Sequence, residues 1–432
     1  MPQPHICSRH GTIPFELPAS WQLSTLARFD DHQMQPDITA LCAAVLDNPI
    51  GTRPLRDSVS SNHTVAILVE DLTRTSPKKI ILQCLLASLK QMGVGSDHIR
   101  IVMALGTHRG LSEEELSTAF GPDIVRDYTF INHDCNAKDL VAIGRLSSGT
   151  EVKINRIVYE ADFRIGIGSI FPHPMNGFGG GGKILFPGVA DYTSIFEHHL
   201  RHSFRDRAVL GMLEGNAFYA EVCALALAGR LDFILNSVLD HQDQLYHLVG
   251  GHPTEAHRAG VDICKGIITQ KFRSAGDVTV ISSFPYSEGP QIMKPLAPAG
   301  MITRKGGTIV LCADCTVPLP EVYYQACEAF RQEHAGRLGP AVLEHFTRQQ
   351  PIIPGSPPEL NMSLAQCLLA LHDFAVILVT RDIPKSMVQR LGFGYADTLD
   401  QAFHIVAKQH ATAAVNIVPS GGVILPVVAE QP

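Results

Sequence analysis

A glycine-rich loop that ends in a lysine is the first stretch of the sequence whose residue types could do chemistry. Residues 172–183 read PHPMNGFGGGGK, so that His173 and Lys183 flank a segment with four consecutive glycines. Glycines let the backbone approach a bulky group closely and expose N–H groups to an anion. The lysine amine could pair with such an anion or serve as a covalent attachment point. The loop therefore predicts a site for a ligand that carries a phosphate or a ring.

Two common nucleotide-binding motifs resemble this loop without fitting it. The phosphate-binding loop of nucleoside triphosphatases requires serine or threonine after the lysine, but Ile184 stands there and Pro187 follows closely. The dinucleotide pattern GxGxxG can be matched on Gly177, Gly179 and Gly182, yet a run of glycines matches many patterns by chance. The residues PHPMN also separate the loop from the preceding predicted strand. Neither nucleotide-binding function is favoured.

Polar residues gather directly after four predicted strands. In open parallel sheets, ligands bind beyond the carboxyl ends of the strands. Four such groups together, rather than one, predict a cleft between two domains. The residues are Asp71 and Arg74 after the first strand, His108 and Arg109 after the second, His173 and Asn176 after the third, and Glu288, Gln291 and Lys294 after the fourth.

Three histidines follow the loop in the predicted helix 193–202, which reads TSIFEHHLRH. His198 and His202 are four residues apart and share one helix face, whereas His199 points to another face. A histidine pair at this spacing can bind a metal ion. However, the sequence contains no HExxH motif, and a helix with three histidines is more often a polar surface. The spacing alone does not select a metal ligand.

Short β-branched runs alternate with longer helical patterns along the chain, which is typical of α/β proteins. We predict an α/β fold of two domains with mainly parallel sheets and an active-site cleft between them. The first domain would span residues 1–270 and the second residues 271–432. The proline-rich segment 348–363 is expected to be a surface loop. The predicted strands are 64–71, 99–106, 162–171, 232–240, 277–285, 307–314 and 374–380, and the main predicted helices are 77–93, 112–121 and 253–270.

The composition narrows the class of protein. The 432 residues are 45% hydrophobic and 18% charged, which is ordinary for a globular chain. The net charge of -7 argues against general affinity for nucleic acid or an anionic membrane surface. No apolar run is long enough to span a bilayer, and the first residues lack a signal-peptide pattern. The ten cysteines have no regular spacing. We therefore expect a reduced, cytoplasmic protein with no nucleic-acid or membrane partner.

The ordered set of motifs resembles the lactate racemase family, the nickel-pincer 2-hydroxyacid racemases and epimerases. The similarity extends over most of the chain and keeps the order of the motifs. The matching stretches are DLTR at 71–74, GTHR at 106–109, PHPMNGFGGGGK at 172–183, His199 sixteen residues after Lys183, QIMK at 291–294, and the closing VPSGGVILP at 418–426. Each motif alone is weak, but together and in register they identify the family.

This resemblance implies a cofactor, a pyridinium-3-thioamide-5-thiocarboxylic acid mononucleotide that binds Ni(II). By position, Lys183 would carry it through a thioamide and His199 would be the protein ligand of nickel. Neutral imidazole and soft sulfur suit square-planar Ni(II). Gly180 and Gly181 would lie against the nucleotide, and Asp71 and Gln291 would orient cofactor or substrate. Enzymes that synthesise the cofactor would be transient partners.

The resemblance also implies the reaction. A 2-hydroxyacid would lose a hydride from its carbon and a proton from its hydroxyl, giving a planar 2-ketoacid that accepts hydride on either face. His108 and His173 would be the acid and base groups. Arg74 and Lys294 would hold the carboxylate and polarise the developing carbonyl oxygen.

Three departures from the family pattern bear on the substrate. Lactate enzymes of the family often read GFSGGRK, so a basic residue is replaced here by Gly182. They carry a tryptophan near the substrate in the second domain, whereas the only tryptophan here is Trp21. Pro290 replaces a common aromatic residue before Gln291. We therefore expect a 2-hydroxyacid other than lactate, with Met175 and Asn176 as candidate pocket residues. The alternatives are a catalytically inactive relative that binds a hydroxyacid or nucleotide, and a metal-dependent hydrolase.

Overall fold

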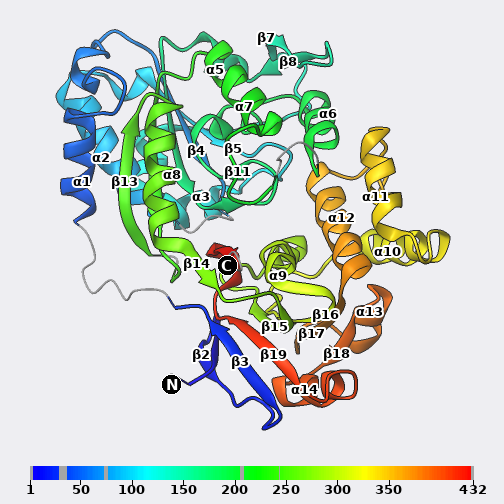
Figure 1. Ribbon diagram of the computed structural model, residues 1–432. Coiled ribbons are helices and arrows are strands. Elements are labelled where there is room, and N and C mark those ends of the chain that lie inside the picture. Colours follow the sequence, from blue (N-terminus) through cyan, green and yellow to red (C-terminus); the bar gives the residue numbers. More distant parts are fainter. Residues whose placement is uncertain (1–2, 29–36, 73–75, 205–208, 243, 430–432) are drawn as a thin grey trace. The chain divides into compact units, whose positions relative to one another are not determined.

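The computed structural model describes residues 3–28, 37–72, 76–204, 209–242 and 244–429. The chain divides into two compact units: residues 31–267 form one, and residues 1–30 together with 268–432 form the other. Labels in Figure 1 mark helices and strands of both units. Across the described ranges, no helix combines the length and the apolar character needed to cross a membrane.

The unit of residues 31–267 is built on a six-stranded sheet in the order β13-β12-β9-β4-β5-β6. Neighbouring strands from β12 to β6 run parallel, and β13 pairs antiparallel with β12. As a result, β4 lies between β9 and β5, and the carboxyl ends of these three strands meet at one edge. The strands are β4 (Val65–Glu70), β5 (Ile99–Ala104), β6 (Thr129–Asn132), β9 (Phe163–Ile170), β12 (Phe233–Leu239) and β13 (Leu245–Gly251).

Buried apolar residues of the sheet and of its first helices form the core of this unit. Leucines and isoleucines of α2, among them Ile81, Leu85 and Leu89, are fully buried against β4, β5 and β9. Their spacing of three to four residues places them on one helix face, as expected for a helix packed on a sheet. The helices are α1 (Ile38–Asp47), α2 (Lys78–Gln91), α3 (Glu113–Phe120), α4 (Pro122–Asp127), α5 (Arg156–Glu160), α6 (Tyr192–His202), α7 (Ala217–Ala228) and α8 (Glu255–Ile268).

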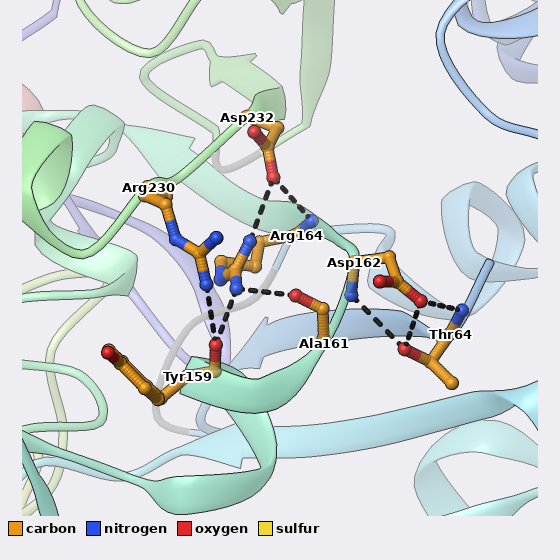
Figure 2. Close-up of polar contacts among 7 residues, drawn as sticks. All are labelled: Thr64, Tyr159, Ala161, Asp162, Arg164, Arg230 and Asp232. Atoms are coloured by element: carbon orange, nitrogen blue, oxygen red, sulfur yellow. Dashed lines mark hydrogen bonds and ion pairs between the residues drawn. The ribbon is translucent and has the colours of Figure 1, made fainter.

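A buried arginine joins the amino-terminal ends of two strands of this sheet, as Figure 2 shows. The Arg164 side chain is 1% exposed, and it contacts the Asp232 carboxylate at 3.3 Å and the Tyr159 carbonyl oxygen at 2.6 Å. Nearby, the Asp162 carboxylate accepts hydrogen bonds from the backbone N–H and hydroxyl of Thr64. Removing one partner of a buried ion pair is costly. These contacts therefore hold the start of β9 against β4 and β12, at the end of the sheet opposite to the candidate site.

Two small hairpins and a short 3-10 turn complete the unit. β7 (Val141–Arg145) pairs antiparallel with β8 (Glu151–Ile154). β10 (Pro172–His173) pairs with β11 (Gly177–Phe178), so the PHPMNGF stretch is itself a hairpin. The turn η3 (Gly181–Ile184) follows directly and packs on β9, β4 and α7.

The second unit also contains a six-stranded sheet, in the order β18-β17-β16-β15-β19-β3, and all of its neighbouring strands are parallel. Its edge strand β3 comes from the first thirty residues. The strands of this unit are β1 (His5–Ser8), β2 (Gly11–Pro14), β3 (Trp21–Leu26), β14 (Thr269–Phe272), β15 (Gly276–Ser282), β16 (Thr303–Cys312), β17 (Ala375–Val379), β18 (Gly394–Ala396), β19 (Ala413–Val418) and β20 (Leu425–Val428). Its helices are α9 (Leu296–Ile302), α10 (Glu321–Glu333), α11 (Leu338–Thr347), α12 (Pro358–Asp373), α13 (Lys385–Arg390) and α14 (Leu399–Ala407).

The structure confirms the α/β fold with mainly parallel sheets. Each of the seven predicted strands is present, within a few residues of its expected ends. The expectation of a surface loop over 348–363 is wrong in its second half. Helix α12 begins at Pro358, and Asn361, Met362 and Ser363 are buried. Proline in the first helical turn is favourable, so the Pro357-Pro358 pair marks a helix start.

Candidate active site

A histidine–carboxylate pair lies at the carboxyl ends of β4 and β5. Nδ1 of His108 is 2.5 Å from Oδ2 of Asp71, the residue that follows β4. The buried Lys78 ammonium donates to the Asp71 carbonyl oxygen at 2.9 Å and so anchors the strand end. Because the carboxylate accepts a hydrogen bond from Nδ1–H, Nε2 of His108 carries a lone pair in the neutral ring. The pair therefore provides an oriented base of the kind found in acid–base catalysis.

A second histidine follows the adjacent strand β9 and is held in the opposite tautomer. Nδ1 of His173 accepts the backbone N–H groups of Met175 at 3.3 Å and Asn176 at 3.1 Å. The hydrogen of the neutral ring is then on Nε2, which lies 2.9 Å from Nζ of Lys183. Lys183 is thus placed as a nucleophile beside an acid–base group.

The four glycines are packed against neighbouring elements. A Cβ on Gly180 would lie 2.7 Å from Oδ1 of Asn236, and one on Gly181 would lie 2.7 Å from the ring of His257. Both residues also have positive φ angles, of 80° and 58°, which favour glycine. The N–H of Gly181 donates to Asn236 at 2.7 Å. The run thus allows η3 to sit close to β12 and α8, and it positions Lys183.

Helix α6 presents its adjacent histidines to different environments. Nδ1–H of His199 donates to the Ile195 carbonyl oxygen one turn earlier, at 2.8 Å, which leaves a lone pair on Nε2. Burial and the positive charge of Lys183 lower the pKa of His199 to about 4, so its ring is neutral near pH 7. Fixing one ring nitrogen in this way prepares the other for a metal ion. His198 is fully buried, so the interpretation of this helix as a polar surface is wrong.

Gln291 and Lys294 lie in the other unit, in and just after the turn η4 (Gly289–Met293) that follows β15. Nζ of Lys294 is 3.3 Å from Oε1 of Gln291 and 4.4 Å from the ring centre of Tyr286. A cation over an aromatic ring is stabilised by the charge distribution of the ring. The Gln366 side chain also donates to the Lys294 carbonyl oxygen. This group forms a small cationic site at the carboxyl end of β15.

Several supporting residues were missed by the sequence reasoning. His257 donates to the Gly179 carbonyl oxygen at 2.8 Å and contacts the Tyr219 hydroxyl at 3.2 Å, so it supports the glycine loop. Burial lowers its pKa to about 4. Asn236 and Tyr286 were missed as well. The signal was weak, because each is a single polar or aromatic residue far in sequence from the motif that it supports.

Of the remaining candidate residues, Arg74 lies outside those that the structure describes. Met175 and Asn176 are buried, and Nδ2 of Asn176 donates to the Phe178 carbonyl oxygen, so Asn176 stabilises the hairpin. That Gly180 and Gly181 lie against a nucleotide remains a prediction.

Comparison with known proteins finds similarity to lactate racemases. A family model described as the lactate racemase N-terminal domain matches residues 9–211. The lactate racemase of Thermoanaerobacterium thermosaccharolyticum is 32% identical over 275 residues, which cover 62% of this chain and 64% of that protein. The lactate racemase of Lactiplantibacillus plantarum is 29% identical over 387 residues, covering 88% of this chain and 89% of that protein.

Solved structures show the same fold. The lactate racemase apoprotein from T. thermosaccharolyticum superposes with a TM-score of 0.87 at 25% identity, over 99% of this chain and 100% of that one. A protein from Thermotoga maritima gives a TM-score of 0.65 at 17% identity, over 92% of this chain and all of that one, and shares the fold.

The fold and the site together define a class of two-unit α/β proteins with paired histidines and a lysine at the ends of parallel strands. Within this class, the chain is similar in sequence and in fold to the lactate racemases.

Proposed function

We propose that this protein is a racemase or epimerase of a 2-hydroxyacid that uses a nickel-pincer nucleotide joined to Lys183. The observation that carries the proposal is the placement of His108 and His173 after β5 and β9, the two strands that flank β4. Their rings are held in opposite tautomers by Asp71 and by backbone N–H groups. Two such groups are what inversion of one carbon requires, because each enantiomer needs its own base.

The donor atoms of the chain suit the proposed cofactor. Neutral His199 offers Nε2 to a metal ion, and imidazole is a suitable ligand for nickel. Lys183 offers an amine that can form an amide-type bond, and it follows a glycine run that is closely packed. His199 would therefore hold the nickel and Lys183 would hold the nucleotide. When bound, the cofactor supplies reversible acceptance of hydride from the substrate carbon.

The side chains of the protein would handle the proton. Nε2 of His108 would take the hydroxyl proton of one enantiomer as hydride leaves the same carbon. His173 would do the same for the other enantiomer after its ring hydrogen moves from Nε2 to Nδ1, which gives Nε2 the lone pair that a base needs. The products of this step are a planar 2-ketoacid and a protonated imidazole. The Asp71 carboxylate stabilises the imidazolium of His108, as in other histidine–carboxylate pairs. Return of the hydride to the other face, and of the proton to the oxygen, completes the inversion.

Arg74 and Lys294 would hold the substrate carboxylate and polarise the developing carbonyl oxygen, because cations stabilise negative charge strongly in a partly desolvated site. Gln291 would orient substrate or cofactor. The substrate would be a 2-hydroxyacid other than lactate. In support, Trp21 is 7% exposed and packs on Phe403 in the core of its unit, so it is not available as a pocket wall. The substrate and the cofactor-synthesis enzymes would be the partners of the protein.

The test is intact-protein mass and nickel analysis on protein produced together with the cofactor-synthesis enzymes. We expect one covalent adduct that maps to Lys183 and is absent from Lys183→Ala and Lys183→Arg, with nickel lost from His199→Ala. The adduct-bearing protein is then given 2-hydroxyacids labelled with deuterium at C2. Retention of the label in both enantiomers supports hydride transfer, whereas exchange with solvent would point to proton abstraction from carbon. An adduct-free chain would refute the proposal.

A further inference from the structure

A cluster of three metal-binding side chains lies between helices α6 and α7. His198 and His202 come from α6 and Glu221 comes from α7. One ligand atom from each residue can be chosen so that all three lie within 4.8 Å of one another. None of these residues has a part in the reaction proposed above. Their role is therefore a separate question.

We propose that His198, His202 and Glu221 form a second metal site, for a divalent transition metal of the Zn²⁺ type, that joins α6 to α7. Two imidazoles and one carboxylate are a common donor set for zinc, with water completing a tetrahedral site. Histidines four residues apart on a helix project from the same face, so the pair is already arranged to share an ion. The carboxylate comes from a different helix, as a cross-link requires.

The distances are close to those of an occupied site. Nε2 of His202 is 2.9 Å from Oε2 of Glu221, and Nε2 of His198 is 3.9 Å from the same oxygen. Ligand atoms around one Zn²⁺ lie roughly 3–3.5 Å apart, since each bond is about 2.1 Å. The two histidine–carboxylate distances lie on either side of this range.

The environment of His198 is the second observation. Its side chain is fully buried, and among the described residues Nδ1 has no hydrogen-bond partner. Nε2 has only the Phe218 carbonyl oxygen at 3.3 Å, besides the more distant carboxylate. Nε2 is the ring nitrogen that approaches Glu221, so a metal ion bound there would replace only one long hydrogen bond.

The site would be structural. A fully buried histidine, with the ring of Phe218 4.2 Å from its own, leaves no room for a substrate on that side. This argues against the metal-dependent hydrolase as an alternative function. His199, the proposed nickel ligand, directs its own ring to Phe218 at 5.0 Å and is bonded to Ile195, so it does not belong to the cluster. A metal at His198 would fix the helix that carries His199.

Zinc titration of the protein without its organic cofactor tests this site. The protein is produced in the absence of the cofactor-synthesis enzymes, stripped with a chelator, and titrated with Zn²⁺ by calorimetry. We expect about one equivalent to bind per chain, with affinity reduced more than about tenfold in His202→Ala and Glu221→Gln. His199→Ala and His404→Ala, in which an adjacent and an exposed histidine are removed, should bind zinc as the wild type does. Circular dichroism confirms that each variant is folded.

Cobalt provides an independent measurement. Co²⁺ in a tetrahedral site of nitrogen and oxygen ligands should give visible absorption that is absent from Glu221→Gln, and Zn²⁺ should displace it. The proposal is overturned if no equivalent binds, or if His202→Ala and Glu221→Gln retain full affinity. Because none of these measurements requires Lys183 or catalysis, their failure would leave the proposed racemase activity untouched.

Discussion

At the scale of single residues, the state of each histidine is set by its hydrogen-bond partner. Asp71 fixes His108 as an acceptor at Nε2, whereas the backbone N–H groups of Met175 and Asn176 fix His173 as a donor at the same atom. The two side chains are chemically identical, so the difference between their tautomers comes from the fold. With both rings neutral, the protein thus presents a hydrogen-bond acceptor after β5 and a hydrogen-bond donor after β9, on either side of β4.

Asp71→Asn should reduce turnover while leaving cofactor and nickel in place. The amide cannot stabilise the imidazolium of His108, and general acid–base groups contribute about 10²–10⁴-fold to rate. We expect kcat of the loaded enzyme to fall by roughly that factor, with unchanged nickel content and intact mass. Asp123→Asn, which removes an exposed carboxylate that pairs only with Arg126 among the described residues, is the control and should leave kcat unchanged. Equal kcat in wild type and Asp71→Asn would contradict the role of the pair.

His257 predicts a pH dependence of stability. Its pKa in the folded protein is about 4, below the ordinary value of 6.5, because burial penalises the charged ring. The unfolded chain therefore binds a proton first as the pH falls. Its stabilising contribution is complete above about pH 6.5 and is lost as the pH falls toward 4, at up to about 1.4 kcal/mol per pH unit.

The free energy of unfolding should thus fall less steeply between about pH 7 and about pH 5 in His257→Gln than in the wild type. Urea unfolding at a series of pH values measures both slopes. The buried His198 and His133, whose pKa values are also lowered, contribute equally to both proteins. Parallel profiles would show that His257 does not titrate as its burial implies.

At the scale of elements, the position of Lys183 depends on how closely η3 packs against α7. A Cβ on Gly182 would lie 2.7 Å from Cβ of Ala226 and 3.2 Å from the Val222 carbonyl oxygen, both on α7. Neither atom can rotate away, so Gly182→Ala should force the two elements apart and destabilise the protein by about 1–3 kcal/mol. Thermal unfolding measures the effect.

Gly266→Ala is the matched control. Gly266 lies in α8, and a Cβ there meets no atom within 4 Å. Alanine is favoured over glycine in helices by up to about 1 kcal/mol, so this variant should be as stable as the wild type or slightly more so. A Gly182→Ala protein of wild-type stability would show that η3 tolerates the added carbon.

Much of the element pattern could be predicted from the sequence, because buried parallel strands are short apolar runs bounded by polar residues. β4, β5, β9 and β12 are of this kind. α12 was partly missed because Pro357 and Pro358 look like a loop, although proline is also favourable where a helix starts. The pairing of β3 with β19 could not be foreseen, since their register joins residues nearly 400 positions apart, such as Trp21 and Ala413.

The motifs of the candidate site could be predicted from the sequence, but the residues that hold those motifs in place could not. His108, His173 and Lys183 stand beside glycine or proline at strand ends, which the sequence displays. The contacts of Asn236 and His257 with the glycine loop join residues 55 and 78 positions apart, and nothing local marks them. The sequence likewise could not show that His198 is buried, because the residue that packs on it, Phe218, comes from another helix.

At the scale of the whole molecule, the proposed functional residues are divided between two compact units. Asp71, His108, His173, Lys183 and His199 belong to residues 31–267, and Gln291 and Lys294 belong to the other unit. Each unit has its own parallel sheet and its own hydrophobic core. The proposed chemistry divides in the same way. Cofactor attachment and proton transfer use the residues of the unit 31–267, and recognition of the substrate carboxylate uses Lys294 of the other unit.

This division predicts that Lys294→Met separates catalysis from cofactor binding. The variant should keep the Lys183 adduct and its nickel, because no proposed cofactor ligand is changed. Its kcat/KM should fall by roughly 10²–10³-fold, since a cation that stabilises developing negative charge is removed.

Lys305→Met is the matched control: Lys305 is 84% exposed in the same unit and pairs with Asp373, so its loss should leave kcat/KM unchanged. An unaltered kcat/KM in Lys294→Met would exclude Lys294 from substrate recognition, whereas loss of the adduct would mean that the second unit is needed to install the cofactor.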